Sequence, residues 1–313
     1  GARAQTDGVF ATARAVSANG GAPLEQRLAA ARLLGRGRQP EDIEVAAGLL
    51  APQLPVELQL AAVAAMGRMN QVAVPERLLA GWESYGRLVR AAVLDLLLSR
   101  PAWTNVLLDR VVADAALRAQ IDSGRRATLA QHSNARVAER ATEIFNAGID
   151  VNRQKVVDRY LAALASLRGD PVKGGLVFAN ICSACHRLGD IAGRPIGPDL
   201  AALSDRSPAY LVPHILDPNR AVEDRYVLYT AVTQDGRNLA GMLAGEAGNS
   251  ITFVELDGVE QVILRGELKS LTSTGRSLMP DGLEAAVNEQ AMADLVVFIA
   301  GAGRGLPGGG KTP

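Results

Sequence analysis

Apolar residues in the first half of the chain recur three and four positions apart, which is the spacing of amphipathic helices. The stretch PLEQRLAAARLLGRG at 23–37 is echoed by PVELQLAAVAAMGRMN at 55–70 and, more loosely, by YGRLVRAAVLDLLLSR at 85–100. The echoes recur at intervals of roughly thirty residues, the length of one helix pair in a helical-repeat array. The intervening segments 39–52 and 74–86 are therefore expected to form the partner helices.

These echoes predict a domain of HEAT-like α-helical repeats over residues 1–150, with an irregular helical bundle as the alternative. The stretch VNRQKVVDRYLAALASLR at 151–168 predicts one more helix, so that residues 151–170 form a helical linker to the next domain. Asp170 and Pro171 are then expected to begin a new helix as its N-cap and its first residue. That helix runs directly into a pair of cysteines.

The pattern changes to short stretches with β-branched residues between about 225 and 270. Turn signals of the QDG, GN and DG type separate these stretches, which predicts a small antiparallel β-unit of four or five strands. The predicted strands are RYVLYTAV, NLAGMLAGE, NSITFVEL and VEQVILRGEL. After the β-unit, Asn288 is expected to cap a last helix with a buried face of Met292, Leu295, Val296 and Ile299. Residues 304–313 are expected to form a flexible tail.

The composition excludes several classes of partner. The 313 residues contain 33 Lys plus Arg and 33 Asp plus Glu, so the net charge is zero and no basic excess favours nucleic acid. No stretch approaches the roughly 18 unbroken apolar residues that a membrane span needs, so no transmembrane segment is expected. The first residues, GARAQTDGVF, do not have the pattern of an export signal, which is expected in a mature form, an excised fragment or a cytoplasmic protein.

The candidate chemistry lies in ICSACHRLGD at 181–190, which holds Cys182, Cys185 and His186. Three kinds of site compete for this pattern: a disulfide redox pair, part of a zinc site, or a covalent haem anchor. A thioredoxin-like pair follows a strand in a βαβ unit, whereas a helical pattern precedes these cysteines. A zinc site needs a further ligand, and the other histidines, His132 and His214, are isolated. The CxxCH spacing favours the haem anchor, in which both thiols join the porphyrin and the histidine binds iron.

A methionine is the expected ligand on the other face of such an iron. Of the five methionines, Met279 lies in the loop GRSLMPDGL, where a flexible segment can reach over a ring. Met242 falls in a predicted strand and is the second candidate. Met66 and Met69 belong to the helical repeats, and Met292 is expected in the core.

The residues just described resemble a known family, class I cytochrome c. GLVFANICSACHRLGDIAGRPIGPDLAAL at 175–203, SLMPDGL at 277–283 and ADLVVFIAG at 293–301 are similar to the C-terminal haem-binding domain of large dehydrogenase-like proteins from Planctomycetes and Verrucomicrobia. The resemblance implies a mainly α fold, in which the helical repeats precede a cytochrome c domain over 171–303. In that subgroup a small antiparallel β-unit is inserted between the proximal histidine and the distal methionine.

The resemblance also implies residue roles. Cys182 and Cys185 correspond to the thioether anchors, His186 to the proximal ligand and Met279 to the distal ligand. Pro198 corresponds to the family's proline whose backbone carbonyl accepts a hydrogen bond from the proximal histidine ring.

Further roles concern the surroundings of the ring. Arg206 and Tyr210 are expected to bind a haem propionate, with a surface and a core position as the respective alternatives. Phe178 and Phe298 are expected to meet where two helices cross, with Gly174 or Gly175 allowing a close approach. His214 is expected to be structural, and the residues expected to bury the ring are Ile181, Ile196, Leu200 and Leu278.

The function implied is a c-type cytochrome module with one covalent haem c, without catalytic residues of its own. It would pass electrons from a fused or partner dehydrogenase to a respiratory acceptor. The alternatives are a peroxidase-like haem enzyme or sensor with a labile distal ligand, and a helical-repeat interaction scaffold. Bacterial haem attachment takes place outside the cytoplasmic membrane, so the resemblance implies a periplasmic protein whose export signal is absent from this sequence.

Overall fold

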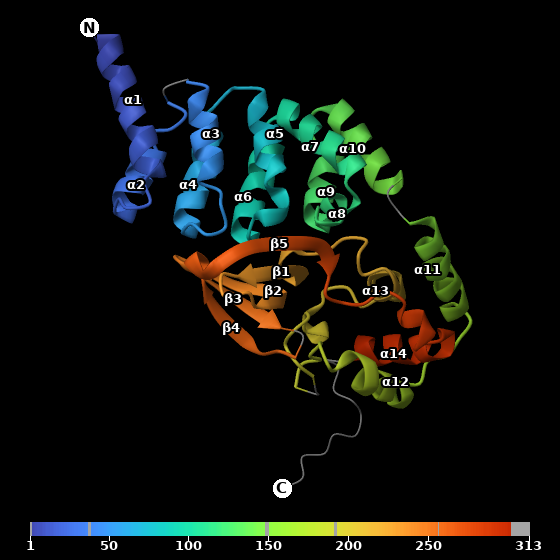
Figure 1. Cartoon of the computed structure of the whole chain (residues 1–313). Helices are drawn as coiled ribbons and strands as arrows, with labels where there is room; N and C mark the ends of the chain where they lie inside the picture. Colours follow the sequence, from blue (N-terminus) through green and yellow to red (C-terminus); the bar gives the residue numbers. More distant parts are fainter. Residues whose placement is uncertain (1, 37–38, 148–149, 191–192, 256, 302–313) are drawn as a thin grey trace. The chain divides into compact units, whose positions relative to one another are not determined.

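Helices make up most of the chain, and a five-stranded antiparallel sheet stands among them (Figure 1). A computed structural model describes residues 2–36, 39–147, 150–190, 193–255 and 257–301. The mainly α class with a small antiparallel β-unit is thus confirmed. The predicted tail, 304–313, lies outside the described residues.

The described residues form two compact units. The first unit comprises the described parts of 1–147, 223–255 and 259–276. The second unit comprises those of 148–222, 256–258 and 277–313. The predicted cytochrome domain contains the strands as an insertion, whereas the structure groups almost the whole sheet with the helices of the first unit.

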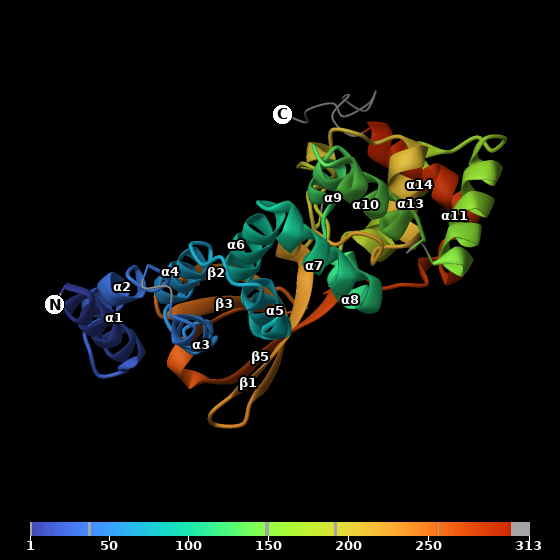
Figure 2. The same cartoon turned by 90° about the horizontal axis from the view of Figure 1, so that it is seen from above.

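The helices of the first unit follow one another as two layers (Figures 1 and 2). In one layer α2 packs beside α4 and α4 beside α6, and in the other α1, α3, α5 and α7 are successive neighbours. The helices are α1 Ala2–Ala18, α2 Leu24–Ala31, α3 Glu41–Gly48, α4 Val56–Met66, α5 Ala73–Ala80, α6 Arg87–Leu98, α7 Pro101–Ala113, α8 Ala115–Ala119, α9 Ser123–Ala130 and α10 Ala135–Ala147.

The echoing sequences correspond to one of these layers. The segments 23–37, 55–70 and 85–100 contain α2, α4 and α6, and the segments between them contain α3 and α5. Each unit of about thirty residues therefore supplies one helix to each layer. The apolar faces of both layers bury a continuous core, in which Leu58, Leu78 and Leu94 are fully inaccessible.

The sheet has the strand order β4-β3-β2-β1-β5. Its strands are β1 Val227–Thr233, β2 Asn238–Ala247, β3 Ser250–Glu255, β4 Glu260–Leu264 and β5 Leu268–Ser277. The first four match the predicted strands, and β5 continues beyond the predicted end near residue 270. The register shifts between Leu243 and Gly245, which marks a bulge in β2.

A buried ion pair joins the sheet to the ends of the helices in the first unit. Arg265 Nη2 lies 2.7 Å from Glu246 Oε2, and both side chains are fully inaccessible. The other carboxylate oxygen of Glu246 accepts a hydrogen bond from Leu88 N–H at the start of α6 (2.9 Å). Arg265 also donates to the carbonyl of Pro52, just before α4 (2.9 Å). Because each charge has a hydrogen-bonded partner, the pair is tolerated in the interior.

The second unit is built from α11 Val151–Leu164, α12 Pro171–Val177, α13 Pro208–Leu216 and α14 Glu289–Gly301. The predicted caps are confirmed. The Asp170 carboxylate accepts from the N–H groups of Val172 and Lys173, and the Asn288 side chain accepts from that of Ala291. These hydrogen bonds satisfy N–H groups that have no partner inside the helix.

Helices α12 and α14 cross in close contact, as the sequence predicted. A Cβ at Gly174 would lie 2.0 Å from the Asp294 carbonyl oxygen, so this crossing leaves no room for a side chain. Phe178 and Phe298 pack beside the crossing with ring centroids 5.8 Å apart. In the part of the chain that the structure describes, no helix has both the length and the apolar character needed to cross a membrane.

Candidate cofactor site

The CxxCH motif forms one tight turn at the end of α12. A π-helical turn, Phe178–Cys182, follows α12 directly. The carbonyl of Cys182 then accepts hydrogen bonds from the N–H groups of both Cys185 (3.1 Å) and His186 (2.8 Å). The two thiols and the imidazole are therefore carried by a single hydrogen-bonded turn.

A loop folds back over this turn. The Cys185 carbonyl accepts from the N–H groups of Ile196 (3.1 Å) and Gly197 (2.7 Å), and Arg187 accepts from that of Leu200 (2.8 Å). These bonds connect residues eleven to thirteen positions apart. They hold the loop against the motif.

The His186 ring is oriented by the backbone of this loop. Its Nδ1 lies 3.0 Å from the Pro198 carbonyl oxygen, which confirms the predicted hydrogen bond. A carbonyl only accepts, so Nδ1 carries the proton and Nε2 keeps its lone pair free for a metal. Burial lowers the pKa of His186, and the Pro198 carbonyl partly opposes that shift. Burial thus favours the neutral imidazole, and the hydrogen bond selects the tautomer whose Nε2 can bind a metal.

Gly197 packs against this imidazole ring. A Cβ built on Gly197 would lie 2.6 Å from Cε1 and 2.7 Å from Nδ1 of His186. Either atom is too close for a real contact, so only glycine fits beside the ring in this position.

Gly197→Ala is therefore expected to displace the loop or the ring. Overpacking of this kind costs about 1–3 kcal/mol, so the amides of Ile196 and Leu200 should exchange with deuterium roughly tenfold faster or more. Residue-resolved hydrogen exchange measures this effect. The matched control is Gly301→Ala, because a Cβ there meets nothing within 4 Å. Equal protection in Gly197→Ala and in the unaltered protein would contradict the packing described.

The chemistry of the thiols argues against the redox and zinc alternatives. Burial, with a smaller contribution from Cys185, raises the pKa of Cys182 to about 11, whereas reactive dithiols have a lowered thiol pKa. Within the described ranges, no group of three or more His, Cys, Asp or Glu side chains is arranged to hold a metal ion.

The methionines have three different surroundings. Met279 is partly buried in the loop after β5 and belongs to the same compact unit as His186. Met292 is fully inaccessible in the core of that unit, as predicted. Met242, the second candidate for the distal position, is 5% exposed within β2 of the first unit, which also contains Met66 and Met69. Met279 is thus the one methionine of the second unit that lies on a loop.

The predicted propionate ligands lie on the segment after the loop. Tyr210 packs against the same apolar core as Ile181, Cys182 and Leu200. Arg206 Nε donates to the Leu203 carbonyl (3.3 Å). Their binding of a propionate stays a prediction.

His214 has a structural arrangement, as expected. Its ring stacks on Tyr210 with centroids 4.3 Å apart, and its Nδ1 lies 2.7 Å from the Tyr210 carbonyl oxygen. The His214 imidazole therefore forms a hydrogen bond within its own helix, α13.

An apolar core surrounds the base of the motif. Ile196 is 4% exposed, and Ile181, Leu200 and Leu278 are partly buried. Their burial of a haem ring stays a prediction. Leu188 is fully inaccessible in the same core, although its position in the motif loop gave no periodic signal.

Two polar residues near Met279 were also not indicated by the sequence pattern. Asn219 and Asp281 hydrogen-bond to each other beside the methionine loop. Asn219 follows Pro218, so the sequence indicates only a turn there.

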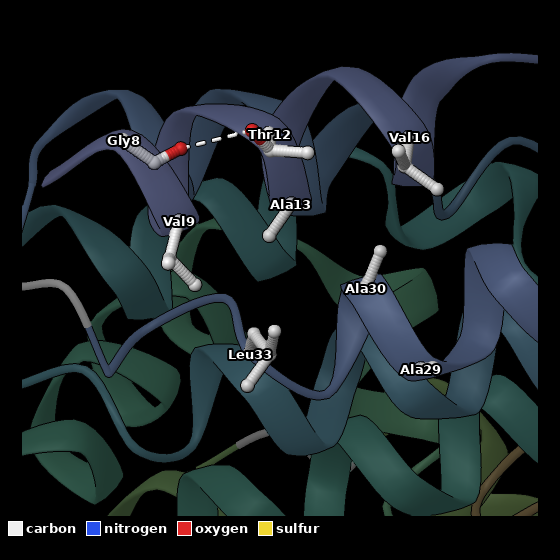
Figure 3. A pocket seen from close by; sticks show the side chains of 8 residues that line it. All are labelled: Gly8, Val9, Thr12, Ala13, Val16, Ala29, Ala30 and Leu33. Carbon is white, nitrogen blue, oxygen red and sulfur yellow. Dashed lines mark hydrogen bonds between the residues drawn. The ribbon is translucent and has the colours of Figure 1, made fainter. Parts of the chain in front are cut away.

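A separate pocket in the first unit is not lined by side chains of the kinds that anchor a haem or bind its iron. It lies between α1 and α2 and is lined by apolar side chains such as Val9, Val16 and Leu33 (Figure 3). The Thr12 hydroxyl donates to the Gly8 carbonyl (2.9 Å). The candidate site is therefore the CxxCH turn and its loop.

Comparison of the chain with models of known protein families and with curated protein sequences gives no match.

Proposed function

We propose that the second unit binds one haem c covalently and that the protein is an electron-transfer cytochrome. The observation that carries this proposal is the His186 ring, which is partly buried and held by the Pro198 carbonyl directly after two free cysteines. A donor set of two thiols, an oriented imidazole Nε2 and a loop thioether fits haem c better than it fits any other common cofactor.

Cys182 and Cys185 would hold the porphyrin through thioether bonds, and His186 and Met279 would ligate its iron. The bound haem supplies a reversible one-electron couple. With both axial positions filled by protein, a substrate cannot reach the iron without displacing a ligand. Outer-sphere electron transfer is then the activity that the site favours.

The protein's own residues would set the properties of this couple. The Pro198 carbonyl would strengthen the imidazole as a metal ligand because it accepts a hydrogen bond from Nδ1–H. Ile181, Ile196 and Leu200 would exclude water from the ring, which would disfavour the more highly charged ferric state. A thioether donor such as Met279 raises the potential relative to a second histidine.

The two-layered helices of the first unit would be HEAT-like repeats and would dock a redox partner. The support is the match between the echoing sequences and α2, α4 and α6. The partners would be a dehydrogenase donor and a respiratory acceptor. Covalent haem attachment places such a protein in the periplasm of a bacterium.

The proposal is tested by spectroscopy of protein produced together with a haem-ligation machinery. A pyridine haemochrome assay on purified, denatured protein should show one covalent haem per chain. The ferric protein should be low spin and show the weak methionine–iron charge-transfer band at the red end of the spectrum. Colourless protein would overturn the proposal, and a high-spin ferric spectrum would favour the enzyme or sensor alternative.

Met279→Leu is expected to abolish the charge-transfer band and lower the reduction potential, because leucine fills similar space but has no donor atom. Optical titration against a potential standard measures both changes. The matched control is Met292→Leu, in the core of the same unit, which should keep the band. A band that survives in Met279→Leu would contradict the assignment of the distal ligand.

A further inference from the structure

We infer that Asn219 is a positioning residue that clamps the Met279 loop and so sets the strength of the methionine–iron bond. This inference rests on the proposed function. It concerns residues of the second unit alone, and it arises from a hydrogen-bond arrangement that the CxxCH motif does not include.

One side chain bridges both flanks of the methionine. Asn219 Oδ1 accepts a hydrogen bond from Ser277 N–H (2.8 Å). Asn219 Nδ2 donates to both carboxylate oxygens of Asp281, each at 2.9 Å. Ser277 and Asp281 lie two residues before and two residues after Met279. The amide group therefore closes the five-residue segment 277–281 into a ring.

The orientation of the amide is fixed by its partners. A backbone N–H requires an acceptor, and a carboxylate requires a donor, so Oδ1 faces Ser277 and Nδ2 faces Asp281. Within the ring, the Met279 N–H donates to Ser277 Oγ (3.1 Å). The backbone of the methionine is thus held directly as well as through its flanks.

The base of the clamp is itself held in place. Asn219 lies in the turn after α13, where Asp217 N–H donates to the Pro213 carbonyl (2.8 Å) and Arg220 N–H to that of Asp217 (3.0 Å). Arg220 Nη1 also donates to the Gln154 side chain of α11 (2.9 Å). A clamp on a rigid turn restricts the loop more than one on a mobile segment.

The far end of the loop has a second anchor. Arg153 of α11 pairs with Glu284 (2.5 Å) and donates to the Leu216 carbonyl at the end of α13. Tyr160 Oη donates to the Val287 carbonyl (2.8 Å). Segment 277–287 is therefore held at both ends, and Asn219 is the residue that acts across Met279.

A free loop gains conformational entropy when a ligand dissociates, and the clamp removes most of that gain. Loss of the clamp should therefore favour release of the Met279 sulfur. It should leave the thioether bonds to Cys182 and Cys185 unchanged.

The test uses Asn219→Asp, which is nearly isosteric. The new carboxylate still accepts from Ser277 N–H but faces Asp281 as a like charge without a donor. Imidazole competes with Met279 for the iron, so its apparent affinity for the ferric protein reports release of the sulfur. We expect that affinity to rise roughly tenfold in Asn219→Asp, the equivalent of one or two lost hydrogen bonds.

The double variant Asn219→Asp/Asp281→Asn reverses donor and acceptor and should restore the affinity to within about twofold of the unaltered protein. Asp281→Asn alone keeps the Ser277 bond and one neutral amide bond, so it should raise the affinity about threefold. Asp281 is exposed, and this variant is expected to fold even if Asn219→Asp does not. The matched control is Asp109→Asn, an exposed carboxylate of α7 in the first unit that accepts a side-chain hydrogen bond from Arg140.

The outcomes separate the inference from the function on which it rests. If the unaltered protein has covalent haem and the methionine band, unchanged imidazole affinity in Asn219→Asp and Asp281→Asn overturns the clamp. If the unaltered protein lacks covalent haem or that band, the proposed function fails first. Failure of the double variant to restore the affinity also counts against the clamp, because any merely structural damage would persist there.

Discussion

Protein in which Cys182 and Cys185 are both replaced by serine is expected to contain no covalently bound haem. A thioether forms from a thiol, and a serine hydroxyl does not replace it under the conditions of haem maturation. Mass spectrometry of the denatured protein measures the result directly, since the unaltered chain should carry the additional mass of one haem. Each single variant should retain at most one thioether bond.

The control for this prediction lies between the two cysteines. Ser183 Oγ donates to the Ala179 carbonyl (2.7 Å), so Ser183→Ala changes the turn without removing a sulfur. It should bind haem as the unaltered protein does. Haem mass that persists on the denatured double-serine variant would show that the attachment is elsewhere.

Glu246→Ala is expected to lower the free energy of unfolding of the first unit by about 3–5 kcal/mol. The substitution leaves the Arg265 guanidinium buried without its counter-charge and removes the acceptor for Leu88 N–H at the start of α6. Both losses weaken the connection between the sheet and the helices. Removing Glu246 and Arg265 together, as Glu246→Leu/Arg265→Met, should cost less than Glu246→Ala, because no charge is then stranded.

Tryptophan fluorescence during urea unfolding measures this effect selectively. The chain's two tryptophans, Trp82 and Trp103, both belong to the first unit. Glu260→Ala, at the exposed start of β4, is the control and should change the free energy by no more than about 0.5 kcal/mol. A midpoint for Glu246→Ala equal to that of the control would mean that the buried pair contributes little.

Local features of the fold were predictable because they depend on neighbours in sequence. Asp170 and Asn288 cap helices through N–H groups two or three residues away. The glycine-containing turns separate strands that pair with the next strand in the chain. The echoing segments identified one layer of helices because each repeat has the same spacing of apolar residues.

Features that depend on distant partners were not predictable in this way. Glu246 and Arg265 resemble surface charges in a strand and a turn, and nothing nearby in sequence indicates that both are fully inaccessible. Asn219 and Asp281 are separated by 62 residues, so their contact depends on the completed fold of the second unit. The Pro198 hydrogen bond was expected only because the surrounding residues resemble a family in which that contact occurs.

Because almost the whole sheet belongs to the first unit, the place where the chain is cut decides which unit stays intact. Apart from 256–258, the chain is in the first unit from residue 223 to residue 276, so the CxxCH turn and the Met279 loop are encoded on opposite sides of the sheet. A cut near residue 150 separates the sheet from the helices on which it packs. A shorter protein that keeps the second unit is better sought by replacing residues 223–276 with a brief linker than by trimming either terminus.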